Sequence, residues 1–154
     1  MPLEIALVEP EIPQNTGNIS RTCVAMGVRL HLVEPLGFSI DDRSLKRAGL
    51  DYWFDLDLVL WPDLSAFLAG MAGRRLFLAS TRAARGYAEV AYPEDAVLVF
   101  GPESRGLPEP LLLTRPDDCV RIPMRPGTRS LNLSNSVAVV AYEWARQHGF
   151  PGLA

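Results

Sequence analysis

Three stretches of the chain combine glycine or proline with asparagine, serine or arginine, and each follows a short apolar run. They are residues 10–22 ("PEIPQNTGNISRT"), 101–108 ("GPESRGLP") and 122–135 ("IPMRPGTRSLNLSN"). In open α/β sheets, ligands bind beyond the carboxyl ends of the strands, where such loops meet. We therefore expect the three stretches to converge on one polar site lined by glycine.

The residue types limit the chemistry of this site. The stretch "NTGNIS" has a single glycine, and the chain contains no GxxxxGK[ST] loop and no G-x-S-x-G elbow, so standard nucleotide sites and serine hydrolysis lose support. Cys23, Cys119, His31 and His148 lack metal-ligand spacing, so no metal site is predicted. What remains suits a reaction whose cofactor is already activated and is mainly positioned by the protein.

Length and composition indicate a globular chain of one domain, residues 1–154, with 48% hydrophobic residues. No apolar run approaches the roughly 20 residues of a membrane span. The first residues carry acids and no basic segment, so we expect a cytoplasmic location and no membrane partner. The net charge of −3 argues mildly against nucleic acid, yet all 15 basic residues except Lys46 are arginine, which suits phosphate contacts. They gather in "DDRSLKRAG", "STRAARG" and "RIPMRPGTR".

Apolar runs alternate with helix-like segments, which predicts a three-layer α/β domain with a mainly parallel sheet. Strands are expected at 3–9, 28–34, 56–61, 75–80, 96–100 and 119–123, and helices at 15–26, 42–48, 62–72 and 132–147. Asp63 or Ser65 is expected to start the third helix. The last helix begins with more polar residues than capping needs, which indicates a buried polar site or an oligomer interface: Ser130, Asn132, Ser134, Asn135 and Ser136.

Three segments together resemble a known family. "NTGNISRT", "FGPESRGLP" and "RIPMRPGTRSLNLSNSVAVVAYE" are similar, in order and spacing, to the three signature motifs of the SpoU branch of the SPOUT RNA 2′-O-methyltransferases. The resemblance covers essentially the whole chain. It implies a SPOUT fold with a deep C-terminal trefoil knot, S-adenosyl-L-methionine as cofactor, and a homodimer with the active site at the subunit interface. Compact members of this kind methylate the ribose of the tRNA anticodon wobble nucleotide, cytidine or uridine 34.

The resemblance also implies roles for single residues. Arg21 matches the arginine that the family uses to activate the 2′-hydroxyl; as a permanent cation it suits clamping phosphate and stabilising alkoxide charge better than acting as a base. Asn15 matches a catalytic asparagine that orients the ribose or the arginine, with helix capping as an equal reading. Glu103 is expected to accept from Arg21, Arg105 or the cofactor, with an Arg105–Glu103 pair slightly favoured.

Cofactor and RNA contacts follow in the same way. By the family pattern the cofactor is held largely by main-chain groups, here at Ala79, Gly101, Ile122, Ser130, Leu131 and Ser134. Glycine at position 101 is expected to let the backbone approach the cofactor. Charge and proximity to the motifs select the RNA contacts Arg43, Lys46, Arg47, Arg125 and Arg129.

Three alternatives remain open at this stage. The chain could methylate another tRNA position or ribosomal RNA, or it could be a noncatalytic knotted RNA-binding module. A flavodoxin-like binder of small ligands is disfavoured, because it would leave the three polar loops without a common purpose.

Overall fold

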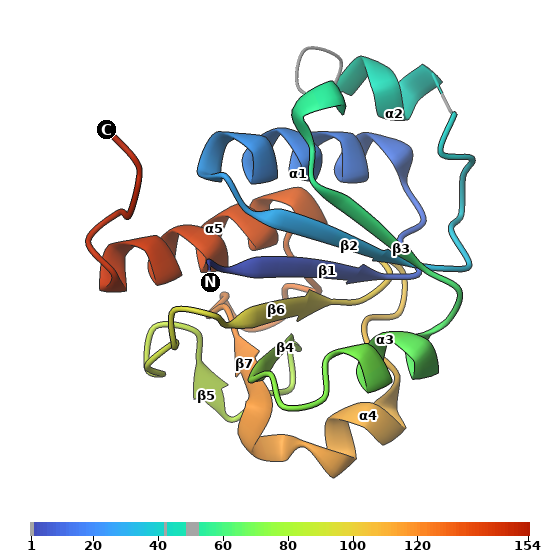
Figure 1. Cartoon of the computed structure of the whole chain (residues 1–154). Helices are drawn as coiled ribbons and strands as arrows, with labels where there is room; N and C mark the ends of the chain where they lie inside the picture. The colour runs from blue at the N-terminus through green and yellow to red at the C-terminus, as the bar shows by residue number, and fades with distance from the viewer. Residues whose placement is uncertain (1, 42, 49–52) are drawn as a thin grey trace.

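Seven strands form one sheet at the centre of the computed structural model, which describes residues 2–41, 43–48 and 53–154 (Figure 1). The strands are β1 (Glu4–Val8), β2 (Arg29–Val33), β3 (Leu58–Trp61), β4 (Leu76–Ala79), β5 (Arg85–Gly86), β6 (Val97–Phe100) and β7 (Cys119–Arg121). Their order is β3-β2-β1-β6-β4-β7-β5, and every neighbouring pair is parallel. The predicted parallel α/β architecture is therefore confirmed.

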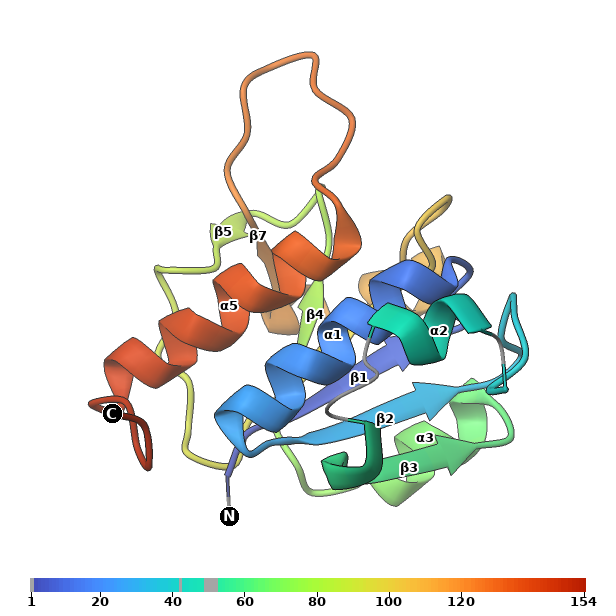
Figure 2. The same cartoon turned by 90° about the horizontal axis from the view of Figure 1, so that it is seen from above.

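Helices cover both faces of the sheet. They are α1 (Pro13–Met26), α2 (Arg43–Ala48), α3 (Leu64–Gly70), α4 (Glu109–Thr114) and α5 (Leu133–Gln147), with short 3₁₀ turns η1 (Trp53–Asp55) and η2 (Pro116–Asp118). Helices α1 and α5 lie side by side on one face, with α2 outside α1, and α3 and α4 lie on the other (Figures 1 and 2). None of the helices in the described ranges is long and apolar enough to cross a membrane.

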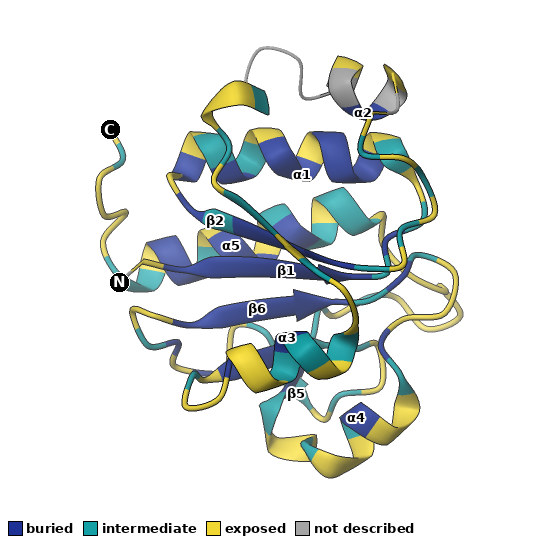
Figure 3. Ribbon diagram, turned by 45° about the vertical axis from the view of Figure 1, so that its right-hand side comes forward, coloured by how far each residue is buried: buried dark blue, intermediate teal, exposed yellow. Residues whose placement is uncertain are grey.

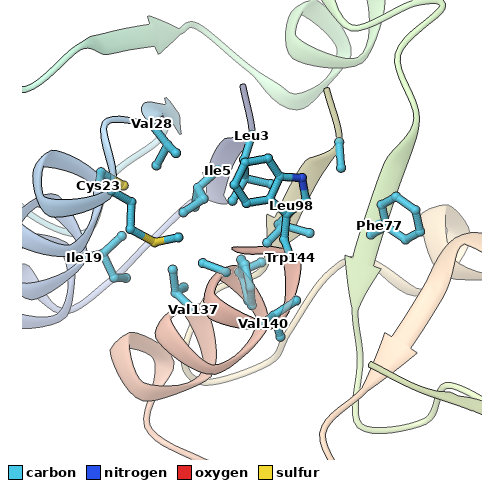
Figure 4. Close-up of a cluster of buried hydrophobic side chains, with 14 of the residues drawn as sticks. Leu3, Ile5, Ile19, Cys23, Val28, Phe77, Leu98, Val137, Val140 and Trp144 are labelled. Carbon is cyan, nitrogen blue, oxygen red and sulfur yellow. The ribbon is translucent and has the colours of Figure 1, made fainter. Parts of the chain in front are cut away.

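The two faces of the sheet bury two separate apolar clusters. Along β1, Ile5 and Leu7 belong to the cluster beneath α1 and α5, whereas Ala6 and Val8 belong to the cluster beneath α3 and α4. Burial on both faces explains why the strands read as continuous apolar runs (Figure 3). Figure 4 shows the first cluster, in which Trp144 of α5 packs among strand residues.

The ten expected elements are present within two residues of the predicted bounds, and the third helix is two residues shorter at each end. Asp63 caps α3, because its side chain accepts a hydrogen bond from the backbone N–H of Ala66 at 2.8 Å. The sequence did not reveal β5, which has two residues, or α4, which starts in a proline-rich stretch. Asp42, the expected first residue of the second helix, lies outside the described residues. The C-terminal knot stays a prediction.

Candidate functional site

Loops that follow four neighbouring strands, β1, β6, β4 and β7, line one pocket of about 750 Å³. Because the strands are parallel, these loops all lie at the carboxyl edge of the sheet. The wall includes Ile12 and Asn15 from the first polar stretch, residues 101–107 from the second, and residues 122, 124 and 129–133 from the third. The predicted convergence of the three stretches is confirmed.

Five of the six expected cofactor residues lie on this wall: Ala79, Gly101, Ile122, Ser130 and Leu131. The sixth, Ser134, lies in the first turn of α5, where its hydroxyl donates to Oδ1 of Asn132 at 2.5 Å. Other wall residues were not expected from the sequence, among them Ser80, Thr81, Arg82 and Phe100, whereas Asn132 and Ser136 belong to the polar excess that indicated a buried polar site. For Ser80, Thr81 and Arg82 a signal was available, since "STR" follows strand β4 just as the other polar loops follow their strands.

The wall has the chemistry of a nucleoside-binding site. The apolar residues Ile122 and Leu131 offer surfaces for a flat base, and the hydroxyls of Ser130 and Ser136 offer polar contacts. In the described part of the chain, the backbone groups of Ile122 and Leu131 have no hydrogen-bond partner, so they are open to a ligand. The volume lies within the range of about 300–1,000 Å³ typical of small-molecule sites. S-adenosyl-L-methionine fits this combination.

Glu103 joins the second polar loop to the first. Its carboxylate accepts hydrogen bonds from the backbone N–H groups of Glu11 at 2.8 Å and Ile12 at 2.9 Å. It also accepts one from Nδ2 of Asn15 at 3.1 Å. Helix α1 has Ile12 at its N-cap, where no side chain can satisfy the free N–H groups. A carboxylate at the positive end of the helix therefore stabilises it from another loop.

Asn15 extends this connection to the third loop. It is 6% exposed, and its Oδ1 accepts a hydrogen bond from Nδ2 of Asn132 at 3.0 Å. Oδ1 of Asn132 in turn caps α5 by accepting from the backbone N–H groups of Ser134 at 2.9 Å and Asn135 at 3.3 Å. The reading of Asn15 as a helix cap was wrong, since α1 begins two residues earlier. The polar excess at the start of α5 is explained in part by this connection.

The model of the "SpoU rRNA Methylase family" matches residues 2–142 of this chain. The chain belongs to the SpoU methylase family. A tRNA (cytidine(34)-2′-O)-methyltransferase from Methylovorus glucosotrophus is 51% identical over 150 residues, which cover 97% of each chain. A solved structure described under "the 2-OH methylation of C/U34 on tRNA" is 48% identical, with a TM-score of 0.91 and 96% of each chain covered.

A further solved structure, an AdoMet-bound rRNA methyltransferase from Sinorhizobium meliloti, has a TM-score of 0.84 and 25% identity. The match covers 94% of this SpoU methylase and 56% of that chain. The likeness therefore extends over nearly the whole of the present chain and over about half of the larger protein.

The acidic side of this SpoU methylase site is braced by Ser104 and Arg105. Glu11 accepts from the backbone N–H of Ser104 at 2.7 Å and from its hydroxyl at 2.9 Å. These bonds, more than the nearby Arg105, lower the pKa of the Glu11 carboxyl. Arg105 donates to Glu9 at 2.9 Å, so the expected pair of Arg105 with Glu103 was wrong. Glu103 is already engaged by the start of α1.

Gly101 is required by the loop itself. A Cβ atom at this position would lie 2.3 Å from the backbone nitrogen of Leu107 and 2.4 Å from the carbonyl carbon of Gly106. Both distances are far inside van der Waals contact, so only glycine permits the turn that closes on Gly106. Glycine at position 101 was expected because it allows close approach of the cofactor, but the backbone of Gly106 and Leu107 already excludes any side chain there.

Arg21 does not belong to the pocket of its own chain. It lies six residues beyond Asn15, about 9 Å along the axis of α1, on the exposed side of the helix that also carries Asn18. The described residues that line the pocket do not include it. The pocket of its own chain, as the described residues define it, therefore does not account for the catalytic role expected of Arg21.

The expected RNA contacts divide into two groups. Arg129 lines the pocket, and Arg125 is exposed in the same loop, which projects from the body of the molecule between β7 and α5 (Figure 2). Arg43 and Arg47 are exposed on α2 and do not line the pocket. The Lys46 side chain is outside the described part of the structure. Within that part, no group of three or more His, Cys, Asp or Glu is placed to hold a metal ion.

Proposed function

We propose that this chain transfers a methyl group from S-adenosyl-L-methionine to the 2′-oxygen of nucleotide 34 of tRNA, cytidine or uridine. The observation that carries the proposal is the pocket at the carboxyl edge of β1, β6, β4 and β7, where three polar loops meet. The match to a tRNA (cytidine(34)-2′-O)-methyltransferase over 97% of both chains supports this substrate.

The pocket residues hold the cofactor in this proposal. S-adenosyl-L-methionine supplies an activated methyl group on a sulfonium, so the protein needs no metal and no nucleophile of its own. The open backbone groups of Ile122 and Leu131 bind its polar edges, and the side chain of Leu131 packs against its base. Ala79, Gly101 and Ser130 complete the wall.

The remaining task of the protein is to position the ribose and to stabilise the oxygen as its proton leaves. The ribose oxygen forms a bond to the methyl carbon while the carbon–sulfur bond breaks, and the hydroxyl proton passes to solvent. The guanidinium of Arg21 acts as a cation in this proposal, so it stabilises the developing negative charge instead of accepting the proton. Asn15 lines the same pocket. Its amide has a second N–H donor and a second acceptor position that the hydrogen bonds to Glu103 and Asn132 do not use, and these can bind the ribose.

A homodimer completes this site. Helices α1 and α5 lie next to each other and expose Asn18 and Arg21 together with Val139 and Tyr142, which are 37% and 42% exposed. A mixed apolar and polar helix face of this kind is suited to a second copy of the chain. Arg21 does not line the pocket of its own chain. In the dimer, the α1 helix of one chain brings Arg21 to the pocket of the other chain.

The other expectations are part of the same proposal. Residues 1–154 act as one domain, the segment after β7 is threaded as a trefoil knot, and the enzyme acts in the cytoplasm, where tRNA is modified. The exposed arginines Arg125 and Arg129 contact the RNA near the pocket, and Arg43, Lys46 and Arg47 contact it farther away.

The decisive experiment is methyl transfer to tRNA that lacks its own modifications. Purified protein is incubated with S-adenosyl-L-methionine and such tRNA, and the methylated nucleotide is mapped by mass spectrometry. We expect one 2′-O-methyl group at position 34. Methylation elsewhere, or on ribosomal RNA alone, contradicts the proposed substrate, and the absence of both transfer and cofactor binding contradicts the proposed activity.

A further inference from the structure

Four arginines line the pocket, and two of them have internal tasks. Arg105 donates to Glu9 at 2.9 Å. Nη1 of Arg121 donates to the carbonyl oxygens of Ala83 at 3.2 Å and Ala84 at 2.7 Å. The other two, Arg82 and Arg129, are exposed at the pocket. Arg129 was expected from the sequence to contact RNA, whereas Arg82 has no role in the function described so far.

The backbone that carries Arg82 is fixed. Its N–H donates to Oγ of Ser80 at 3.2 Å, and the N–H of Ala83 donates to the carbonyl of Ser80 at 3.3 Å. The next two carbonyl groups are those held by Arg121. The loop after β4 is therefore a hydrogen-bonded turn, and it presents a side chain that remains 73% exposed. A fixed backbone with an exposed guanidinium suits recognition of a ligand from solution.

The internal partner of Arg82 is weak. Among the described residues, Glu109 at the start of α4 is its ion-pair partner, with 3.9 Å between Nη1 and Oε1, and 63% of the Glu109 side chain is exposed. Exposed pairs at this separation contribute little to stability. Arg82 can therefore exchange this carboxylate for a better anion at small cost, whereas Arg105 would have to give up a contact of 2.9 Å with Glu9.

We propose that Arg82 binds a backbone phosphate of the RNA beside the nucleotide that is methylated. A ribose whose 2′-oxygen enters the pocket leaves its flanking phosphates at the mouth, where Arg82 and Arg129 lie on the loops after the adjacent strands β4 and β7. The planar guanidinium matches two phosphate oxygens. The inference rests on the proposed function and adds a residue that binds the substrate.

The test measures the dissociation constant of tRNA as a function of salt for four proteins: wild type, Arg82→Gln, Glu109→Gln and the double variant. Loss of one phosphate contact raises the constant for Arg82→Gln about 3- to 10-fold. It also lowers the slope of log affinity against log salt by about 0.7, the value for one phosphate of a single strand. Removing the competing carboxylate in Glu109→Gln tightens binding, and this gain disappears in the double variant.

Arg75→Gln is the matched control, because Arg75 is also exposed and paired with an acid, Asp118 at 3.2 Å, but lies before β4, at the opposite end of that strand from the pocket. It should change neither the tRNA constant nor the slope. Calorimetry with S-adenosylhomocysteine should give the same affinity for wild type and Arg82→Gln. If Arg82→Gln weakens this binding and leaves the salt slope unchanged, Arg82 contacts the cofactor and the inference is wrong. If wild type binds no tRNA at all, the proposed function fails; if it binds and Arg82→Gln binds equally, only the role of Arg82 fails.

Discussion

Oδ1 of Asn15 accepts a hydrogen bond from Nδ2 of Asn132 at 3.0 Å, and this contact joins the start of α1 to the start of α5 across 117 positions of the sequence. The orientation of both amides follows from their other partners. Glu103 can only accept, so it takes the NH₂ group of Asn15, and the backbone N–H groups of α5 can only donate, so they take the oxygen of Asn132. Three of the four loops of the pocket, those after β1, β6 and β7, are thus held by one directional set of hydrogen bonds.

Replacing Asn15 by aspartate should disrupt this set in a pH-dependent way. Asn15→Asp places a second carboxylate against Glu103 in a buried position, so we expect a loss of about 2–3 kcal/mol of unfolding free energy at pH 7. Burial and the like charge raise the pKa of the new carboxyl above its unfolded value. The loss should therefore shrink as the pH falls and the acid becomes protonated. Urea unfolding between about pH 5 and 8 measures this.

Asn18→Asp is the control for that variant, because Asn18 lies on the same helix and is exposed. It should change the unfolding free energy by at most about 0.5 kcal/mol. Equal losses for the two substitutions would show that the hydrogen bonds of Asn15 contribute nothing specific.

Two glycine substitutions separate the effect of steric overlap from that of backbone strain. Gly101→Ala forces a Cβ atom against the backbone of Leu107, and we expect a loss of about 2–3 kcal/mol together with at least tenfold weaker binding of S-adenosylhomocysteine. Gly106→Ala meets no atom within 4 Å but must adopt a φ of +72°, which costs about 1 kcal/mol. Thermal unfolding and calorimetry of both variants decide between the two effects. Both glycines lie on the pocket wall, so similar cofactor affinities for the two variants would contradict the inference that steric overlap at Gly101 distorts the pocket.

Much of the fold could be predicted because both faces of the sheet are buried. Strand β6 is apolar throughout and β1 is apolar after Glu4, and the apolar residues of α5 recur with a clear helical period. Strand β5 could not be predicted, because Arg85 and Gly86 form no apolar pattern. They are a strand only because the fold places them beside β7. Helix α4 escaped because Pro108 and Pro110 are typical of a loop as well as of a helix start.

The site was predictable as a set of loops, and less so as a set of contacts. The Gly, Asn, Ser and Arg content of the loops indicated a polar site. Their convergence was predictable because the loops follow parallel strands of one sheet. The partners of Glu103 and Arg105 could not be deduced, because the carboxylates of Glu9, Glu11 and Glu103 all lie within reach of the same turn. Which carboxylate takes which donor is decided by distances of a few ångströms that the sequence does not encode locally.

His31 should make the stability of the protein sensitive to acid. Nε1 of Trp61 can only donate, and it donates to Nδ1 of His31 at 2.9 Å, so the neutral ring carries its proton on Nε2, which faces Glu4 at 3.6 Å. Burial lowers the pKa of His31 below its usual 6.5, with the Glu4 carboxylate opposing this and Arg29 and Arg74 adding to it. Protonation of Nδ1 would also place its N–H group against the N–H group of Trp61.

The sign of the effect follows from these contacts. Above about pH 6.5 neither the folded nor the unfolded state binds the proton, so this contribution is constant; as the pH falls below that value, the unfolded state binds it first. Unfolding free energy should therefore decrease on acidification, by at most about 1.4 kcal/mol per pH unit from this group. His31→Gln should flatten this part of the curve, and Trp61→Phe should flatten it partly. An unchanged slope in His31→Gln would assign the acid sensitivity to other groups.

Mixed dimers test whether Arg21 acts on the pocket of the other chain. Arg21→Ala alone should lower methyl transfer about 100-fold or more and leave S-adenosylhomocysteine binding unchanged, because the arginine stabilises charge that develops on the ribose oxygen. Leu131→Asp, a change at a 40% exposed wall residue, should abolish cofactor binding without unfolding the chain. If the arginine acts across the interface, a dimer of one chain of each variant contains one complete site and regains about half of the wild-type activity.

The matched dimer pairs a wild-type chain with a chain that carries both substitutions. If Arg21 acts across the interface, this dimer has no complete site, because the intact pocket faces alanine and the intact arginine faces the damaged pocket. If Arg21 acts within its own chain, the wild-type chain keeps a complete site and the activities of the two mixed dimers are exchanged. Tandem affinity tags isolate each mixed dimer, and transfer of labelled methyl groups to tRNA gives the readout. Activity confined to the dimer with the doubly substituted chain would therefore overturn the composite site, whose basis is the position of Arg21 outside the pocket of its own chain.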